Sequence, residues 1–157
     1  MLVGNVLDTY RPVIEDAGMS LLISAQMASI RPVHGDAQLL LQMISNLLEN
    51  CIQHCPPGTT ITCEMNDPSD SVWLSIADSG PGIPTQEYES VLQRLYRLEK
   101  SRTTPGSGLG LSLVKAVADL HVADLSLHDN EPGLKVRVSF PSIALLNRSM
   151  WIDGSRH

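Results

Sequence analysis

The sequence predicts an α+β fold, a two-layer sandwich in which helices cover one face of a mixed, mostly antiparallel sheet. The first observation behind this prediction is the order of the expected elements: helix, strands, helix, hairpin, loop, helix, hairpin. Hairpins placed between helices favour this architecture, whereas a doubly wound nucleotide fold would alternate strands and helices strictly. The second observation is that the chain has 157 residues, of which 43% are hydrophobic, enough for one domain with a real core.

The first elements are expected to be a helix and one or two strands. Apolar residues recur at helical spacing from Val3 to Ile14, and Gly18 ends this helix. Residues 20–25 are typical of a strand, and residues 31–34 of a short second strand.

A long second helix is expected to begin at Asp36, which suits an N-cap, and to end at the Pro-Pro-Gly of 56–58. Within it, Cys51 and Cys55 lie four residues apart on one face, close to His54, a spacing that also fits a metal pair. No second cysteine or histidine pair completes such a site, so we interpret both as small buried apolar residues. The apolar side of this helix carries Leu40, Ile44, Leu47, Leu48 and Cys51.

The rest of the chain alternates hairpins and helices. Apolar and polar residues alternate on both sides of a turn at 66–70, which predicts a hairpin whose second strand runs into Asp78. Residues 1–141 are therefore expected to form one domain, and 142–157 a tail that is disordered or packed on its outside. The remaining expected elements are a short helical stretch at 86–96, a helix at 109–121, and a hairpin of 124–128 and 134–140 around a turn at 130–133.

Composition excludes several classes of protein. The formal net charge of −6 argues against a nucleic-acid-binding protein, which usually carries a basic patch. No apolar run approaches the roughly 18 residues of a membrane span, and the first residues lack the pattern of a signal peptide. Three cysteines, an odd number, do not make a disulfide framework, so a reducing cytosol is expected.

Two glycine-rich stretches carry most of the chemical information. At 78–83, Asp78 stands at the end of an expected strand and is followed by Gly80 and Gly82; its carboxylate can accept a hydrogen bond from an amino group. At 106–111, three glycines lead into a helix, and such a helix N-terminus favours phosphate. Taken singly, the first stretch is also good turn chemistry and the second also suits a flexible joint.

The long helix and the loop between the glycine stretches add two further features. Asn46 and Asn50 share one helix face, and carboxamide oxygens suit Mg²⁺, with Glu49 placed to accept from a metal-bound water; solvated polar residues are the alternative. The segment 84–105 is polar and carries cations, so it is expected to be a lid over polyphosphate, unless these charges are merely solvated. The cations are Arg97, Lys100 and Arg102.

These features occur in the order Asn46 to Asn50, 78–83, Leu95-Tyr96-Arg97 and 106–111. In this order the chain resembles the catalytic ATP-binding (HATPase) domain of bacterial two-component sensor histidine kinases, of the GHKL ATPase superfamily that includes gyrase, Hsp90 and MutL. The four stretches are similar to its N, G1, F and G2 boxes, and the resemblance covers roughly residues 35–141.

The resemblance implies a Bergerat-type ATP-binding fold with ATP and Mg²⁺ as cofactors. Asp78 would bind the adenine amine, Asn50 would hold the metal, and Asn46 would contact phosphate or its water shell. The implied catalytic residues are Asn46, Glu49 and Asn50. The implied ATP-binding residues are Asn46, Asn50, Gln53, His54, Asp78, Gly80, Gly82, Ile83, Tyr96, Arg97, Lys100, Arg102, Gly106, Ser107, Gly108, Leu109, Gly110 and Leu111.

Three residues depart from the family pattern. Leu95 stands where the family usually has Phe, Gln53 where many members have Lys or Arg, and His54 at a position that is often aromatic. These changes bear on rate and affinity, and they keep open an alternative: a nucleotide-gated interaction module that binds ATP without phosphotransfer.

The resemblance also implies partners that this sequence does not supply. The γ-phosphoryl group would go to a histidine on a separate dimerisation domain of the same receptor, and then to a response regulator. No stretch here looks like that phosphoacceptor helix, so we expect a monomeric fragment of a larger receptor. It is expected to be the cytoplasmic portion of an inner-membrane-anchored sensor, without direct membrane insertion or nucleic-acid binding.

Overall fold

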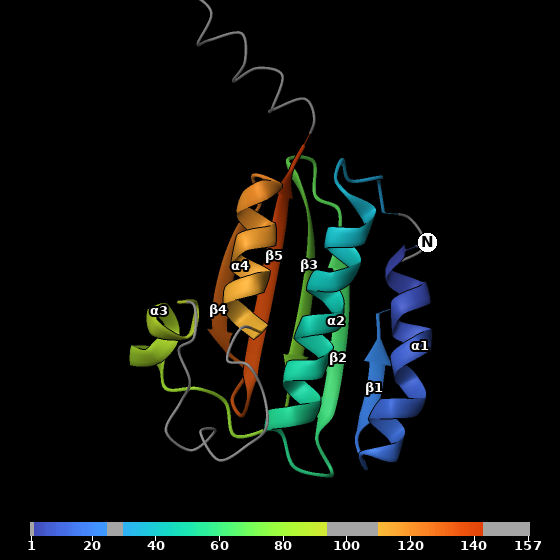
Figure 1. The fold of residues 1–157 in the computed structure, drawn as a ribbon, viewed down its shortest axis with the longest axis vertical. Helices are drawn as coiled ribbons and strands as arrows, with labels where there is room; N and C mark the ends of the chain where they lie inside the picture. The colour runs from blue at the N-terminus through green and yellow to red at the C-terminus, as the bar shows by residue number, and fades with distance from the viewer. Residues whose placement is uncertain (1, 25–29, 94–109, 143–157) are drawn as a thin grey trace, which may run out of the picture.

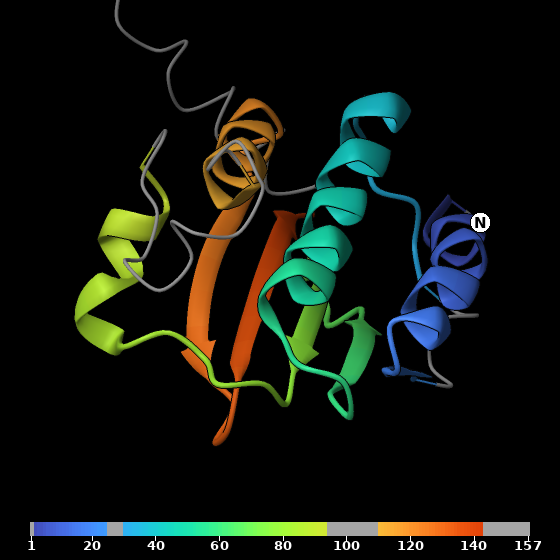
Figure 2. The same ribbon diagram turned by 60° about the horizontal axis from the view of Figure 1, so that its bottom comes forward.

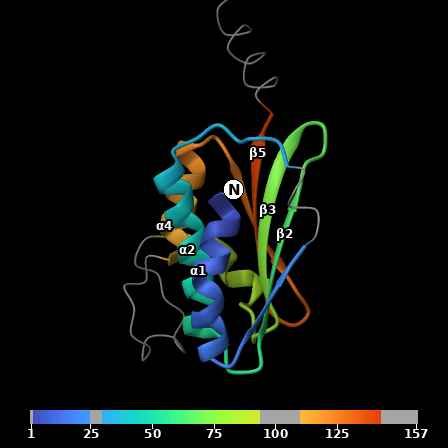
Figure 3. The same cartoon turned by 90° about the vertical axis from the view of Figure 1, so that its right-hand side faces the viewer.

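The computed structural model describes residues 2–24, 30–93 and 110–142. A single five-stranded sheet has the order β1-β2-β3-β5-β4, and the long helices lie side by side on one of its faces (Figures 1 and 3). The predicted two-layer α+β sandwich is confirmed. The strands are β1 (Ser20–Ile23), β2 (Thr60–Asn66), β3 (Ser71–Asp78), β4 (Asp124–Asp129) and β5 (Leu134–Pro141). The helices are α1 (Leu2–Asp16), α2 (Ala37–His54), η2 (Thr85–Glu87, a 3₁₀ turn), α3 (Tyr88–Val91) and α4 (Gly110–Leu120).

Strand pairing matches the predicted hairpins. β1 runs parallel to β2, with Ser20 opposite Thr60, and the other three pairings are antiparallel. β3 and β5 lie side by side at the centre, with Ala77 opposite Lys135, so the end of β3 meets the start of β5. This pairing places Asp78 beside the turn between β4 and β5.

The strand predicted at residues 31–34 is wrong, because these residues form no strand. Pro32 has no N–H for a ladder, and the main-chain N–H of Arg31 donates instead to the Asp67 carboxylate at 2.8 Å. The segment therefore crosses from the sheet to α2 as a connection.

The predicted N-cap of α2 is confirmed. Asp36 Oδ1 accepts hydrogen bonds from the main-chain N–H groups of Gln38 and Leu39, at 2.9 and 3.0 Å. The main-chain N–H of Asp36 itself donates to Nε2 of His121, at 3.0 Å, just beyond the end of α4. The start of α2 is thereby tied to the end of α4.

The core fills the space between the helices and the sheet. α1 contributes four buried residues, but Val13, which shares its helical spacing, remains 49% exposed. α2 buries Met43, Ile44, Leu47, Leu48 and Cys51. Among the described residues, no helix is long and apolar enough to cross a membrane.

The other face of the sheet carries polar side chains, and none of the described helices covers it (Figure 3). The Arg137 guanidinium lies 4.2 Å from the centre of the Trp73 ring, a cation–π contact. Lys135 pairs with Glu64 across the strands at 3.4 Å, and Ser75 between these pairs is only 1% exposed. Long charged side chains thus cover the strands where no helix does.

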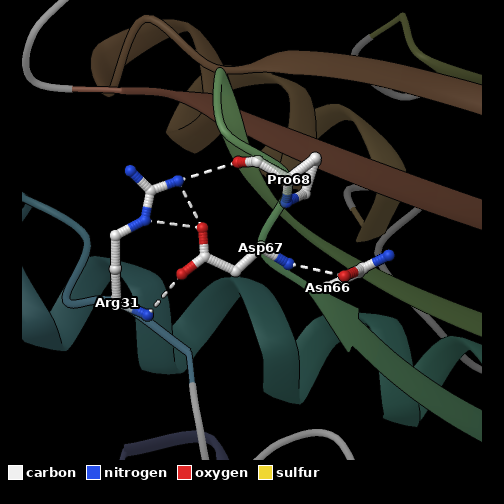
Figure 4. A network of polar contacts seen from close by, with 4 residues as sticks. All are labelled: Arg31, Asn66, Asp67 and Pro68. Atoms are coloured by element: carbon white, nitrogen blue, oxygen red, sulfur yellow. Dashed lines mark hydrogen bonds and ion pairs between the residues drawn. The ribbon is translucent and has the colours of Figure 1, made fainter.

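A polar cluster holds the connection before α2 against the β2–β3 turn (Figure 4). Arg31 Nε donates to Asp67 Oδ1 at 2.6 Å, and its guanidinium also donates to the Pro68 carbonyl at 2.8 Å. The main-chain N–H of Asp67 donates to Asn66 Oδ1, at 2.8 Å. The side-chain hydrogen bond from Arg31, followed by the one from its main-chain N–H, lowers the pKa of Asp67 below its ordinary value of 3.8.

This cluster predicts a pH-dependent contribution to stability. A carboxylate whose pKa is lowered in the folded state stabilises it above its unfolded pKa, and this contribution is lost as the pH falls through the folded pKa. Asp67→Asn is therefore expected to lower the melting temperature at pH 7, and this deficit should be smaller at about pH 3, where protonation of the carboxylate has begun to remove the contribution. Asp8→Asn, an exposed residue of α1 that removes the same charge, is the control. An equal deficit at both pH values would contradict the prediction.

Candidate functional site

The candidate site lies where the ends of several elements meet. The last turns of α2, the end of β3 and the β4–β5 turn gather at the lower end of the molecule in Figure 1, and Figure 2 brings this end forward. α4 begins beside α2 on the same side, and the two helices pack together. The predicted site residues on these elements are therefore brought to one end of the sandwich.

Asp78, the last residue of β3, is held firmly although it is charged and only 7% exposed. Its Oδ1 accepts from the main-chain N–H of Gly80 at 2.9 Å and from that of Leu134 at 3.4 Å. Its Oδ2 faces the Cys51 thiol, with the sulfur 3.9 Å away. Because a thiol is a weak donor, Oδ2 keeps the capacity to accept from an amino group.

Close backbone approach around Asp78 depends on glycine at three positions. A Cβ on Gly80 would lie 2.6 Å from Cys55 Sγ, and a Cβ on Gly82 would lie 2.9 Å from the carbonyl oxygen of Gly133. Gly133 has φ +111°, and a Cβ there would overlap the carbonyl oxygen of Asp78. The same oxygen accepts from Asn130 Nδ2 at 2.8 Å. The β4–β5 turn is therefore the back wall of the site.

Gly133 and Asn130 were missed by the sequence analysis, which placed them in an ordinary hairpin turn. An Asn-Glu-Pro-Gly turn carries no local signal of a distant partner. The signal that could have found them was the pairing of β3 with β5, because that register sets residues 133 and 134 against the end of β3.

Two thiols from α2 flank the Asp78 carboxylate. Cys51 is buried, as interpreted from the sequence, and Cys55 is half-buried. Burial, with the Asp78 charge as the second cause, raises the pKa of Cys51 well above its ordinary value and that of Cys55 to about 12. Both groups are therefore protonated at neutral pH. Within the described ranges, no three His, Cys, Asp or Glu side chains are arranged to hold a metal.

The paired asparagines of α2 lie near the start of α4. A Cβ on Gly110, the first residue of α4, would lie 3.2 Å from Asn50 Oδ1. One turn earlier, Asn46 Nδ2 is buried and has no hydrogen-bond partner within the described part of the chain. A buried amide without a partner is costly, so this nitrogen suits a ligand oxygen. The structure thus brings Asn50 to the last glycine of the second glycine-rich stretch, with Asn46 one turn earlier on the same helix.

Glu49 is engaged elsewhere. Its Oε1 accepts a hydrogen bond from the Tyr10 hydroxyl of α1 at 2.5 Å. Burial, followed by this hydrogen bond, raises the pKa of Tyr10. The next residue, Asn50, faces the start of α4. One turn of α2 therefore contacts α1 through Glu49 and the candidate site through Asn50. The expected role of Glu49 at a metal-bound water stays a prediction.

The remaining predicted residues divide into two groups. Gln53 and His54 are exposed on the last turn of α2, Ile83 is half-buried, and the Leu111 side chain is buried in the core. Of the segment expected to be a lid, η2 and α3 are described; together they cover 85–91 and overlap the helical stretch predicted at 86–96. Leu95, Tyr96, Arg97, Lys100, Arg102, Gly106, Ser107, Gly108 and Leu109 lie outside the described residues.

Taken together, the arrangement has two chemical ends. One end is a carboxylate beside closely packed glycines, whose Oδ2 meets only a weak thiol donor and keeps acceptor capacity, which fits the amino group of a flat ring. The other end is a pair of carboxamides beside a helix N-terminus, which fits an anion and a hard cation.

Comparison with known proteins agrees with this geometry. Residues 35–144 match the family model described as histidine kinase-, DNA gyrase B- and HSP90-like ATPase. The sensor protein IrlS of Burkholderia pseudomallei is 32% identical over 144 residues, which is 89% of this chain and 30% of that protein. The signal transduction histidine-protein kinase/phosphatase MprB of Mycolicibacterium paratuberculosis is 36% identical over 154 residues, 84% of this chain and 29% of that protein. The chain thus spans about 30% of the length of these relatives.

Solved structures show the same fold. A mycobacterial sensor histidine kinase MprB superposes with a TM-score of 0.75 at 29% identity, covering 89% of this chain and 93% of that one. The catalytic domain of the histidine kinase ThkA gives a TM-score of 0.78 at 23% identity, covering 89% and 91%. The second likeness concerns the fold alone.

The wall formed by Gly133 can be tested by adding one methyl group. Gly133→Ala is expected to lower the free energy of unfolding by more than about 3 kcal/mol, because it adds a collision with Asp78 to an unfavourable φ. Gly58→Ala is the matched control, since Gly58 has φ +89° and nothing within 4 Å of the added Cβ; it should cost about 1 to 2 kcal/mol. Denaturant unfolding of both variants measures the difference. Equal costs would show that the turn does not press on Asp78.

Proposed function

Because the chain belongs to the family of histidine kinase-, DNA gyrase B- and HSP90-like ATPases, we propose that it is the ATP-binding catalytic domain of a sensor histidine kinase. In this role it binds Mg-ATP and presents the γ-phosphoryl group to a histidine on a separate domain. The observation that carries the proposal is the buried Asp78 carboxylate, with one oxygen fixed by two amides and the other left to accept.

The base would bind at Asp78. Oδ2 would accept a hydrogen bond from the exocyclic amine of adenine, while Gly80 and Gly82 shape the surroundings of the ring and Ile83 adds an apolar contact. Support comes from the close packing of both glycines beside Asp78: a Cβ on Gly80 would meet Cys55 Sγ, and a Cβ on Gly82 the Gly133 carbonyl oxygen, each within 3 Å. An acceptor at this position favours adenine over a base that presents a carbonyl there.

The phosphates would bind between α2 and the start of α4. Asn46 Nδ2 would donate to a phosphate oxygen or its water shell, and the main-chain amides of Gly108, Leu109 and Gly110 would do the same at the helix N-terminus. Asn50 Oδ1 would hold Mg²⁺, which when bound neutralises charge on the transferred phosphoryl group. Support comes from the unpartnered Asn46 nitrogen and from the contact between Asn50 and Gly110.

Several further residues complete the proposed site. Residues 84–105 would close over the nucleotide as a lid, and Leu111 would contribute through its main chain because its side chain lies in the core. Glu49 would accept from a metal-bound water. The other proposed contacts are Gln53, His54, Tyr96, Arg97, Lys100, Arg102, Gly106 and Ser107.

The proposed reaction is a phosphoryl transfer. An imidazole nitrogen of the acceptor histidine bonds to the γ-phosphorus as the bond to the bridging oxygen breaks, which releases ADP. Positioning dominates this chemistry, so a separate dimerisation and phosphoacceptor domain is required. A response regulator would receive the phosphoryl group next. The parent protein would be a membrane-anchored sensor with this domain in the cytoplasm; the sensor role is supported by its likeness to a sensor protein and to a signal transduction histidine-protein kinase/phosphatase.

Base recognition predicts a specific loss in Asp78→Asn. The carboxamide can present an N–H where the carboxylate accepts, so the Kd for Mg-ATP is expected to rise about 10- to 100-fold. Isothermal titration and the thermal shift with Mg-ATP measure the change. Asp124→Asn, which removes an exposed charge from β4, is the control and should bind normally. Unchanged binding in Asp78→Asn would exclude Asp78 as the base contact.

Catalysis of phosphoryl transfer is tested by supplying the domain that carries the acceptor histidine. With a dimerisation and phosphoacceptor domain added in trans or fused to the chain, γ-labelled ATP should give acid-labile label on histidine. Asn50→Ala is expected to lower this labelling at least about 100-fold, because it removes the metal ligand, whereas Gln42→Ala on the exposed side of α2 should not. Bound Mg-ATP without histidine labelling would instead favour the nucleotide-gated interaction module.

A further inference from the structure

The Asp78 carboxylate is held differently at its two oxygens. Two main-chain amides donate to Oδ1, at 2.9 and 3.4 Å. Oδ2 faces the side of α2, where Cys51 Sγ lies 3.9 Å away. One turn further along α2, the Cys55 thiol also hydrogen-bonds to Asp78, and its sulfur lies against Gly80. The oxygen left to meet the base is thus Oδ2, which the Cys51 thiol faces.

Both sulfur atoms are donors in this setting. Burial and the neighbouring carboxylate raise the pKa of Cys55 to about 12 and that of Cys51 well above its ordinary value. The groups therefore carry S–H at neutral pH and are poor nucleophiles. Their role is then one of hydrogen bonding and shape, and covalent chemistry is disfavoured.

A weak donor is well suited to this place. Two amides on Oδ1 leave the carboxylate free to tilt about that oxygen, so Oδ2 needs a second support. A thiol gives this support and, because it bonds weakly, leaves Oδ2 with acceptor capacity for an incoming amine. The half-buried Cys55 thiol also closes the recess beside Gly80.

From these contacts we propose that Cys51 and Cys55 are positioning residues for base recognition: their thiols hold the Asp78 carboxylate so that Oδ2 faces the amino group of the bound purine. This inference rests on the proposed function. It predicts that the thiols contribute to discrimination between purines, over and above any contribution to packing.

The test compares ATP with ITP, which presents a carbonyl oxygen where ATP presents the amine. The ratio of the two Kd values is measured by titration of the chain and its variants with Mg²⁺ present. Cys51→Ala and Cys55→Ala are each expected to reduce the preference for ATP about 3-fold, and the double variant about 10-fold. Cys51→Ser and Cys55→Ser also reduce the side-chain volume, but they keep a hydrogen-bond donor. They should therefore retain most of the preference for ATP. Cys63→Ala, at a buried cysteine of β2, should lower the melting temperature without changing the ratio.

The outcomes separate the two proposals. If Asp78→Asn abolishes the preference but the cysteine variants keep it, the positioning role is overturned and the proposed function stands. If serine and alanine variants lose the preference equally, the thiols act by packing and the inference is also overturned. If the unchanged chain does not prefer ATP over ITP, and Asp78→Asn binds both nucleotides with the same Kd values as the unchanged chain, the proposed function itself fails. Cys55→Ser, at the half-buried position, keeps the test available should a Cys51 variant not fold.

Discussion

The close approach of the β4–β5 turn to Asp78 is the contact on which the candidate site depends. β3 and β5 pair along their whole length, and the pairing sets Gly133 directly against the carbonyl group of Asp78. Asn130 donates to that carbonyl and Leu134 to the carboxylate. A buried carboxyl group is tolerated only when such donors replace water, so the turn is what allows the Asp78 side chain to be buried at the end of β3.

α2 distributes the remaining contacts. Within its last three turns the helix presents Cys51 and Cys55 to Asp78, Asn50 to the start of α4, and Glu49 to Tyr10 of α1. Because residues on a helix keep their angular relation, displacement of α2 would move all three contacts together. The Asp36 cap and the bond from Asp36 to His121 fix the opposite end of α2. The two chemical ends of the site therefore share one rigid support.

Much of the fold could be predicted because its signals are local. Alternation predicted both hairpins, and a single aspartate followed by an apolar series predicted the start of α2. The short strand at 31–34 was predicted from side-chain pattern alone, while hydrogen bonds to Asp67 decided the outcome. Val13 has the right spacing for the core, yet α1 lies at the edge of the helical layer beside β1 and leaves it half exposed.

The site could be predicted in part for the same reason. Some site residues stand in stretches whose local sequence is informative by itself: Asp78, the two asparagines and Gly110. The fold brings these residues to one end of the molecule. Asn130, Gly133 and the thiols acquire their roles only from tertiary neighbours. The ligand contacts assigned to residues 94–109 lie outside the described residues and remain proposals.

The back wall has a consequence for how this chain tolerates change over time. The Glu131 and Pro132 side chains are exposed, and φ +46° at Glu131 favours residues that tolerate a left-handed main chain. Gly133 packs against the carbonyl oxygen of Asp78, a residue 55 positions earlier in the sequence. It can be exchanged for another residue only if the main chain at Asp78 moves as well. Two nearby positions of one short turn thus experience very different selection. A library randomised across 130–133 would return some variety at 131 and almost none at 133.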